Sequence, residues 1–415
     1  MLKPLLSAAI ANLMKDRTSS LLQVLALTGI ITFALLLLLN ILYESSYDRY
    51  HAKADHLYRV VSNVNDGDNE YQWNTSQATL APELLKRFPE VRNAVRFSAL
   101  GKIVFKDGNR RFEEEGFYAA DESVFKMFSW RLLKGDCATA LARPGTMVIT
   151  EKIARKVFGS VENAYQKVLK TDNGDMYMIR GVMENVPPNS HFTFDGLVSG
   201  SSNRALSGGW GNFSTYTYIE LPEHYNTGRM LSHLKKVARE NLNPIADQVE
   251  MRISYQLQPL TQIHQGCKGP GATDAGLGDF MYAIAFMLVL GAAATLFIKS
   301  RTFGQPSELE ALHSIGMKRS TLILQMITES VCITVVAFVV SILIVLATLP
   351  LVSNILGKTL PISLLWHSSV FITMLAVFLF AGFVSALYPS FYLPKMHALG
   401  GIGRERLKKE EIYIA

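Results

Sequence analysis

Four long apolar runs dominate the pattern of hydrophobic and polar positions along the chain. They cover residues 18–43, 280–298, 322–349 and 364–387. The first two runs contain no charged residue, the third is interrupted only by Glu329, and the fourth only by His367. A helix that crosses the hydrocarbon core needs about 20 apolar residues, and each run reaches or approaches that length. The pattern predicts four transmembrane helices, at 19–43, 280–298, 322–349 and 364–388, because core helices of soluble proteins rarely form four such runs.

The first run is longer than the core of a signal peptide, which has about 7–15 apolar residues and is followed by a small-residue cleavage site. Here the run is followed by Glu44-Ser-Ser-Tyr47. We therefore expect a retained transmembrane helix. It is preceded by a cytoplasmic or interfacial segment, 1–18, in which residues 2–14 are predicted to form an amphipathic helix along the membrane surface.

Lysine and arginine residues gather in three of the segments that flank the apolar runs. These are the N-terminal tail, the 299–321 connection and the C-terminal tail, 389–415, whereas the 350–363 connection has only Lys358. Because basic residues mark cytoplasmic segments, we expect both termini and 299–321 in the cytoplasm, with 44–279 and 350–363 outside it. The net charge of +6 then reflects topology and gives no reason to expect a nucleic-acid partner.

The segment 44–279 mixes strand and helix patterns and is predicted to be an α+β domain. Strands are indicated at 57–64, 91–100, 146–150, 176–183, 215–221 and 249–260, with a hairpin at 102–112 around Asp107-Gly108. Helical spacing is found at 77–88, 151–158 and 227–242. In the first of these helices, Leu80, Leu84, Leu85 and Phe88 are expected on one buried face. Since strands lie at both ends, we expect the domain to close on itself.

Motifs that carry catalytic chemistry are absent from the sequence. It has no GxxxxGK[ST] phosphate loop, no HExxH, no GxSxG and no CxxC. His51 and His56 lack metal-site spacing, and we expect them to be solvated surface residues. Cys137 and Cys267 both lie in 44–279, where an oxidising compartment would permit a disulfide, but the sequence leaves their pairing open. We expect no enzyme activity, cofactor or metal in this chain.

A short capped helix is predicted between the second and third apolar runs. Ser307 and Glu310 have the spacing of a capping box, and Gly316 can end the helix. Its apolar side offers a docking surface to a cytoplasmic partner, and its basic end favours membrane lipid phosphate. The candidate residues are Glu308, Leu309, Leu312, His313, Ile315, Gly316 and Lys318. The alternative is a plain helical turn between antiparallel spans.

Glu329 is an ionisable residue within a predicted span, and such residues are costly in the membrane. It lies about one to two turns inside the cytoplasmic end of that span, where its carboxylate can reach the interface or a donor. A proton relay would require further buried carboxylates in the predicted spans, and the sequence has none there. We therefore favour a polar packing contact near the membrane edge.

Several stretches distributed along the chain, taken together, resemble those of a known protein family. They are YDRYH at 47–51, DHLYRV at 55–60, LAPELLKRFPEV at 80–91, FSWRLLKG at 128–135, ITEKIARKVFG at 149–159, LQPLTQIH at 257–264 and SALYPSFYL at 385–393. With the order of one span, a large domain and three spans, the chain resembles the MacB/FtsX-type permeases. These are the membrane subunits of type VII ABC transporters, and the stretches are similar to the branch common in Bacteroidota.

The resemblance implies a permease of the bacterial inner membrane, with a MacB periplasmic-core-like domain inserted between transmembrane helices 1 and 2. It implies a separate cytoplasmic ABC ATPase, which would bind ATP and Mg, and a second permease subunit in a homodimer or heterodimer. The expected activity is mechanotransmission to the periplasm, for efflux or lipoprotein release. The short helix at 307–320 would be the ATPase-coupling helix.

This short helix departs from the family's usual Glu-x-Gly-x-Arg-Lys-x-x-Gly-Ala/Ser pattern. Glu308 and Gly316 fit, whereas Glu310, Leu312 and His313 replace the inner glycine and the two basic residues. The departure leaves open the degenerate half of a heterodimer, a permease with a co-adapted ATPase, and drift in a tolerant interface. A different class of protein also stays open, namely a membrane-anchored sensor or scaffold that has lost ATPase coupling.

Overall fold

The computed structural model describes most of the chain between residues 17 and 264 and part of its C-terminal region. The described residues are 17–264 without 66, 68, 108–109, 203 and 247–250, then 319–366, 371–380 and 382–383, and also Ser7, Ala11 and Met14. The chain divides into a helical unit, Met1–Ser45 with Asp279–Ala415, and a sheet unit, Ser46–Gly278. The predictions for 280–298, 299–318 and 389–415 lie outside the described residues, as does most of 2–14.

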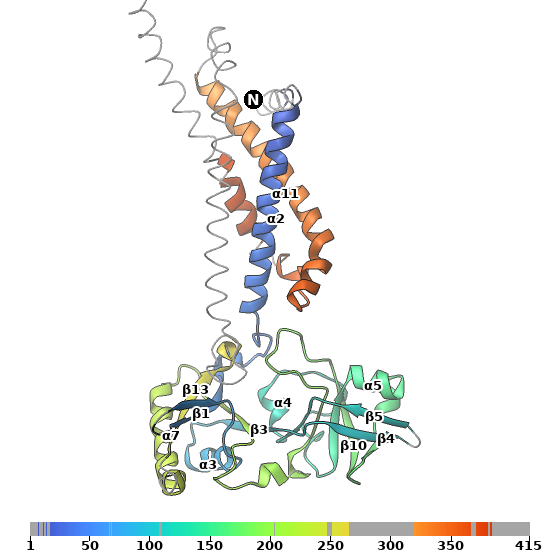
Figure 1. The fold of residues 1–415 in the computed structure, drawn as a ribbon, viewed down its shortest axis with the longest axis vertical. Coiled ribbons are helices and arrows are strands. Elements are labelled where there is room, and N and C mark those ends of the chain that lie inside the picture. Colours follow the sequence, from blue (N-terminus) through green and yellow to red (C-terminus); the bar gives the residue numbers. More distant parts are fainter. Residues whose placement is uncertain are drawn as a thin grey trace, which may run out of the picture. The chain divides into compact units, whose positions relative to one another are not determined.

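Two long helices make up most of the described part of the helical unit. They are α2 (Arg17–Ser45) and α11 (Arg319–Leu356), which pack against each other (Figure 1). The short η6 (Ile362–Leu364) follows α11. Ser20–Ser45 and Leu324–Leu356 are long and apolar enough to cross a membrane, and a shorter apolar helix covers Phe371–Phe380. The predicted helices at 19–43 and 322–349 are thus helical in the structure.

The helix α11 extends beyond the predicted span at both ends. It continues through Pro350, which lacks an N–H donor and so removes one hydrogen bond of the helix. The first half of the segment 350–363, expected to be a connection, is therefore helical, since α11 includes residues 350–356. The next described helix, Phe371–Phe380, begins later than the predicted start at residue 364, because residues 362–364 form η6.

The sheet unit is an α+β domain built on one large sheet. Its strands are β1 (Leu57–Asn65), β2 (Glu70–Trp73), β3 (Asn93–Ala99), β4 (Ile103–Asp107), β5 (Arg110–Glu114), β6 (Phe117–Ala120), β7 (Leu132–Gly135), β8 (Thr146–Thr150), β9 (Val168–Thr171), β10 (Met176–Met183), β11 (Gly196–Ser199), β12 (Tyr216–Glu220) and β13 (Arg252–Pro259). Its helices are η1 (Ala54–His56), α3 (Leu80–Arg87), α4 (Val124–Met127), α5 (Glu151–Phe158), α6 (Val161–Ala164), η2 (Gly200–Ser202), η3 (Arg204–Ser207), α7 (Thr227–Asn241), α8 (Asn243–Ala246) and η5 (Leu260–Gln262).

The strand order is β13-β1-β12-β3-β6-β11-β8-β10-β9-β4-β5, with β2 beside β1 and β7 beside β10. Neighbouring strands are antiparallel except for β6 with β11 and β8 with β10. The first strand pairs with the last over a long register, from Tyr58 opposite Pro259 to Asn65 opposite Arg252. This pairing confirms the expectation that a domain with strands at both ends closes on itself.

Local sequence signals account for several of these elements. Helix α5 begins after Thr150 and ends at Gly159, whose φ of 77° lies in the left-handed region that favours glycine. Asn226 is the N-cap of helix α7, and its side chain accepts hydrogen bonds from the backbone N–H groups of Gly228 and Arg229 in the first turn. The predicted hairpin is confirmed by the pairing of β4 with β5. One detail is wrong: Leu85, expected on the buried face of α3, is 44% exposed.

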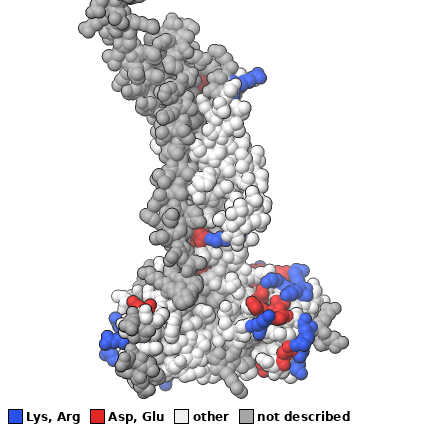
Figure 2. All heavy atoms as spheres, in the orientation of Figure 1, with Lys and Arg blue, Asp and Glu red and all other residues white. Residues whose placement is uncertain are grey.

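Three hydrophobic clusters fill the sheet unit. Helices α3 and α7 cover one end of the sheet, and α5 and α6 cover the other end (Figure 1). Between them, a cluster rich in aromatic rings includes Phe97, Phe128, Trp130, Phe192 and Tyr218. Charged side chains of both signs gather over α5, β4 and β5, whereas the described surface of the helical unit is nearly free of charge (Figure 2).

A close backbone approach between β7 and β10 requires glycine at residue 135. Gly135 lies opposite Gly181 and has a φ of 101°, and a Cβ there would collide with the carbonyl oxygen of Arg180. We expect Gly135→Ala to destabilise this part of the sheet by about 3 kcal/mol, through strain and overpacking together.

Hydrogen exchange of the full-length protein in detergent measures this effect. The backbone amides of β7 and β10 should exchange faster in the Gly135→Ala variant than in the parent. Gly209→Ala is the matched control, because nothing lies within 4 Å of a Cβ at residue 209. Equal exchange in the two variants would contradict the predicted strain.

Candidate functional site

The residues predicted to contact an ATPase cannot be located in the described structure. Glu308, Leu309, Leu312, His313, Ile315, Gly316 and Lys318 all lie outside the described residues, and so does Cys267. Cys137 is exposed and is a free thiol. The docking surface of the short helix therefore stays a prediction.

Glu329 is described and is buried in the helical unit, with 4% of its surface exposed. Its carboxylate accepts a hydrogen bond from Gln325 Nε2, one turn earlier on α11, at 3.4 Å. Ten residues separate it from the start of α11, which corresponds to about 15 Å along the helix axis. The contact with Gln325 is consistent with a polar packing role.

The most elaborate polar site of the sheet unit lies in residues 46–51, directly after α2 in the sequence, which we call the anchor segment. At its centre Asp48 is completely buried and has a φ of 58°, a left-handed conformation that aspartate tolerates better than most residues. Its backbone N–H donates to the carbonyl of Asn189 at 3.0 Å. An unpaired charge in such a position would be very unfavourable, so its partners define the site.

The partners of Asp48 come from the loop 189–191, which lies about 140 residues further along the chain. Ser190 Oγ donates to Asp48 Oδ1 at 3.0 Å, and the backbone N–H of His191 donates to the same oxygen at 3.2 Å. The ring atom His191 Nδ1 lies 2.8 Å from Asp48 Oδ2. Three groups of one short loop thus surround a single carboxylate.

The rest of the anchor segment contacts the same loop and the aromatic cluster. Asn189 Nδ2 donates to the carbonyl and to Oγ of Ser46, at 3.1 and 3.0 Å. The Tyr50 hydroxyl donates to Ser190 Oγ at 3.0 Å and accepts from Trp130 Nε1 at 3.1 Å. Burial raises the pKa of Tyr50 to about 12, so this hydroxyl keeps its proton at neutral pH.

His51 is buried, so the expectation of a solvated surface histidine is wrong. Its Nδ1 accepts a hydrogen bond from the backbone N–H of Ser129 at 3.0 Å, and its ring meets Phe128 and Trp130 edge-on. Burial lowers the pKa of His51 to about 4, although Asp48 opposes the shift. The imidazole is therefore neutral at pH 7. His56 is half-buried.

A chain of polar contacts leads from the anchor segment to the last strand. Burial also lowers the pKa of His191, so its neutral form prevails. His191 Nε2 and the Tyr218 hydroxyl of β12 lie 2.8 Å apart and share a hydrogen bond. Arg59 of β1, which also reaches Tyr218, donates to Gln258 of β13 at 2.7 Å.

The segment that follows β13 returns to the anchor segment. The ring of His264 stacks on Tyr47, with parallel planes and centroids 3.5 Å apart. Because β1 and β13 are paired, the beginning and the end of the sheet unit lie side by side. The anchor segment therefore connects three parts of the unit, namely its first strand, the loop 189–191 and the segment after β13.

Comparison with protein families gives the chain two matches that together cover most of its length. Residues 20–236, more than half of the chain, match the MacB-like periplasmic core domain, and residues 280–398 match the FtsX-like permease C-terminal domain. The chain belongs to the MacB/FtsX-type ABC transporter permeases. The anchor segment and the loop 189–191 both lie within its MacB-like periplasmic core domain.

Solved structures similar to this permease are periplasmic or permease domains. One is a domain assigned to a permease protein of Porphyromonas gingivalis, with 22% identity, coverage of 50% of this chain and 91% of that one, and a TM-score of 0.46. Another is the periplasmic region of MacB from Actinobacillus actinomycetemcomitans, with 14% identity, coverage of 48% and 88%, and a TM-score of 0.36. No curated protein sequence matches this chain.

The permease also has a partly buried ion pair in its helical unit. Glu44, near the end of α2, is 4% exposed and pairs with Lys358, which follows α11. The sequence marks Lys358 as a lone basic residue and Glu44 as the first charge after an apolar run, but nothing local links two residues more than 300 positions apart. Among the described residues, no group of three histidine, cysteine, aspartate or glutamate side chains is arranged to hold a metal ion.

Acid should destabilise the core around the anchor segment of this permease. Because the pKa of His51 is lowered, the unfolded state binds a proton between about pH 6.5 and pH 4 that the folded state does not bind. The contribution of His51 to the free energy of unfolding is therefore fully present above about pH 6.5 and is lost as the pH falls toward 4. We expect His51 to account for about 2 kcal/mol of this loss.

Hydrogen exchange in residues 124–130 of the full-length protein, measured from pH 7.5 to pH 4.5 and corrected for intrinsic rates, tests this prediction. His51→Asn keeps an acceptor for the Ser129 N–H but cannot titrate. The variant should show a shallower pH dependence than the parent. Parallel curves for the two proteins would exclude His51 as the titrating group.

Proposed function

We propose that this protein is the permease subunit of an ABC transporter that couples ATP hydrolysis by a separate cytoplasmic ATPase to movement of its periplasmic domain. The movement of the periplasmic domain would drive efflux, lipoprotein release or another periplasmic process. Because the partner hydrolyses ATP, this chain needs no catalytic residue of its own. The observation that carries the proposal is the anchor segment, which joins the residues directly after α2 to the sheet by buried polar contacts.

The anchor segment is strong enough to transmit a displacement. Each hydrogen bond to a charged group contributes about 1.5–3 kcal/mol, and a buried donor left without a partner costs about 1–3 kcal/mol. Asp48 receives such bonds from Ser190 and His191, and Ser46 and Tyr50 add further bonds to the same loop. Shifting the anchor segment alone would break several of them together, so the loop and the sheet would move with it.

The proposed arrangement has four transmembrane helices, with the periplasmic domain between the first and the second. The two apolar helices α2 and α11 support this arrangement, as does the match of 280–398 to the FtsX-like domain. The distribution of lysine and arginine favours cytoplasmic termini in the inner membrane. A second permease subunit, identical or different, would complete the transporter.

The short helix predicted at 307–320 is the proposed contact with the ATPase. We expect Leu312→Asp to abolish co-purification of the ATPase from native membranes, because a charge would be buried in an apolar contact. Leu407→Asp, in the C-terminal tail, is the matched control and should leave co-purification intact. Mass spectrometry of the material extracted in mild detergent gives the readout.

Two outcomes of this experiment would count against the proposal. An ATPase that stays bound to the Leu312→Asp variant would place the docking surface elsewhere. A parent protein that is recovered without any ATPase, even with nucleotide trapped, would favour the membrane-anchored sensor or scaffold. A second and different permease in the same material would identify this chain as one half of a heterodimer.

The anchor segment should be separable from ATPase binding. Asp48→Ala leaves the donors of Ser190 and His191 without their buried acceptor, and we expect a local loss of about 3 kcal/mol. Hydrogen exchange in residues 186–192 should accelerate about 100-fold, while the ATPase still co-purifies. Asp55→Ala, at an exposed position in η1, is the control and should change neither quantity. Unchanged exchange in the Asp48 variant would contradict the role of the anchor segment.

A further inference from the structure

Two oppositely charged side chains are buried in the sheet unit, Asp48 in the anchor segment and Arg59 in β1. Asp48 is completely buried, and 4% of Arg59 is exposed. Two neutral side chains connect them. His191 Nδ1 lies 2.8 Å from Asp48 Oδ2, His191 Nε2 shares a hydrogen bond of 2.8 Å with the Tyr218 hydroxyl, and Arg59 donates to the same hydroxyl. We call Asp48, His191, Tyr218 and Arg59 the relay.

Further contacts continue from the relay to the end of the sheet unit. Arg59 donates to Gln258 Oε1 of β13 at 2.7 Å, and Gln258 Nε2 donates to the carbonyl of Gln262 in η5 at 3.4 Å. Two residues further along the chain, His264 stacks on Tyr47 of the anchor segment. The series of contacts that begins in the anchor segment therefore returns to it and forms a closed ring.

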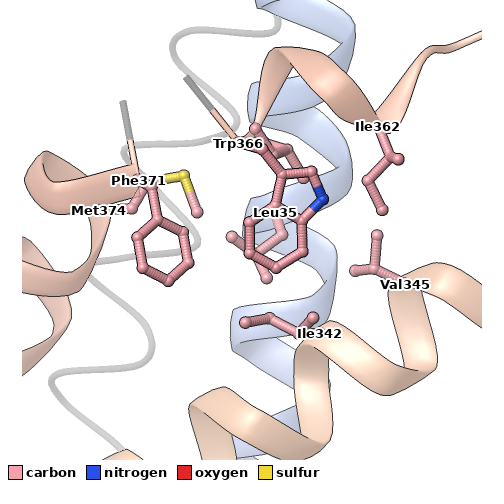
Figure 3. Close-up of a pocket in the computed structure, with 8 residues that line it drawn as sticks. Leu35, Ile342, Val345, Ile362, Trp366, Phe371 and Met374 are labelled. Atoms are coloured by element: carbon pink, nitrogen blue, oxygen red, sulfur yellow. The ribbon is translucent and has the colours of Figure 1, made fainter. Parts of the chain in front are cut away.

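Directional contacts of this kind differ from those around Leu35 in the helical unit. Leu35 of α2 lies among apolar side chains that include Ile342 and Val345 of α11 and Met374 of the helix Phe371–Phe380 (Figure 3). Apolar contact is non-directional, so such side chains can exchange one apolar neighbour for another when helices shift. A hydrogen bond weakens steeply once its angle falls below about 120°, so a shift at one end of the relay weakens the next bond.

We propose that Tyr218 is the positioning residue through which the anchor segment controls β13 and η5. Its hydroxyl contacts both His191, on the side of Asp48, and Arg59, on the side of β13. Asp48 and Arg59 also attract each other in a buried region, where electrostatic interactions are stronger than in water. A displacement of the anchor segment is thereby passed to the last strand of the sheet.

The use of the relay in transport rests on the proposed function. A displacement that reaches the anchor segment from α2 would pass through Tyr218 to η5, from which the chain continues to the apolar run 280–298. The two ends of the sheet unit would then respond together.

The relay predicts that substitutions of Asp48 and Tyr218 do not act independently, and a double-mutant cycle measures this. Asp48→Asn removes the charge and keeps a side chain that tolerates the left-handed backbone, whereas Tyr218→Phe removes only the hydroxyl. Hydrogen exchange is measured in residues 255–262 of the full-length protein in detergent. We expect each single variant to accelerate exchange there about tenfold. The double variant should exchange no faster than Tyr218→Phe alone.

Tyr216→Phe is the matched control, because Tyr216 lies on the same strand and its hydroxyl makes no hydrogen bond to any residue that the structure describes. In this background, Asp48→Asn should keep its full effect on residues 255–262. Residues beyond 262 are excluded from the measurement, because His264 contacts Tyr47 of the anchor segment directly.

Two results would overturn the proposal. Effects that multiply, to about 100-fold in the double variant, would mean that Asp48 and Tyr218 act independently. No effect of Asp48→Asn on residues 255–262 would mean that the anchor segment does not act on β13. Should Tyr218→Phe fail to fold, Gln258→Met takes its place in the cycle, since it removes an acceptor of Arg59 and keeps an unbranched side chain.

Co-purification of the ATPase with the same variants keeps the relay separate from the proposed function. Neither Asp48→Asn nor Tyr218→Phe should change it. An ATPase that is missing from the parent preparation would contradict the proposed function, whereas the outcome of the double-mutant cycle does not depend on a bound ATPase.

Discussion

The carboxylate of Asp48 is the group on which the organisation of the sheet unit depends. A buried charge is tolerated only where donors surround it, and the donors here come from a loop 140 residues away. The loop 189–191 comes five residues before β11, which pairs with β6, and the anchor segment comes shortly before η1 and β1. The burial of this one side chain therefore requires that the anchor segment and the loop 189–191 are both correctly placed.

The histidines around Asp48 have a different physical role from that of metal ligands or surface charges. His51 and His191 are both kept neutral by burial, and each uses a ring nitrogen as a hydrogen-bond partner. Neutral imidazole joins an aromatic cluster to a polar network, because it offers both a flat apolar face and polar edges. The cluster of Phe97, Phe128, Trp130, Phe192 and Tyr218 provides the matching surface.

Local patterns predicted the elements of this fold better than its contacts. The strand β10, and β8 followed by α5, were predicted from short apolar and helical signals that each lie within a few residues. The closing of the domain followed from strands at its two ends. In contrast, the burial of His51 depends on Ser129 and Trp130, and the partner of Asp48 depends on a loop that the sequence marks only by its prolines and Asn189. Such contacts between distant segments have no local signature, and Leu85 shows that even a helical face is uncertain at its edge.

The pairing of β1 with β13 also has a consequence for synthesis of the protein. About 190 residues separate the two strands in the sequence. At about 5–20 residues per second, β1 is made roughly 10–40 s before its neighbour. During that interval β1 can pair locally with β2, but the edge that β13 will occupy is open to other strands. The nascent domain therefore passes through a long period in which protection of that edge, by a chaperone or by the membrane surface, decides whether the sheet closes correctly.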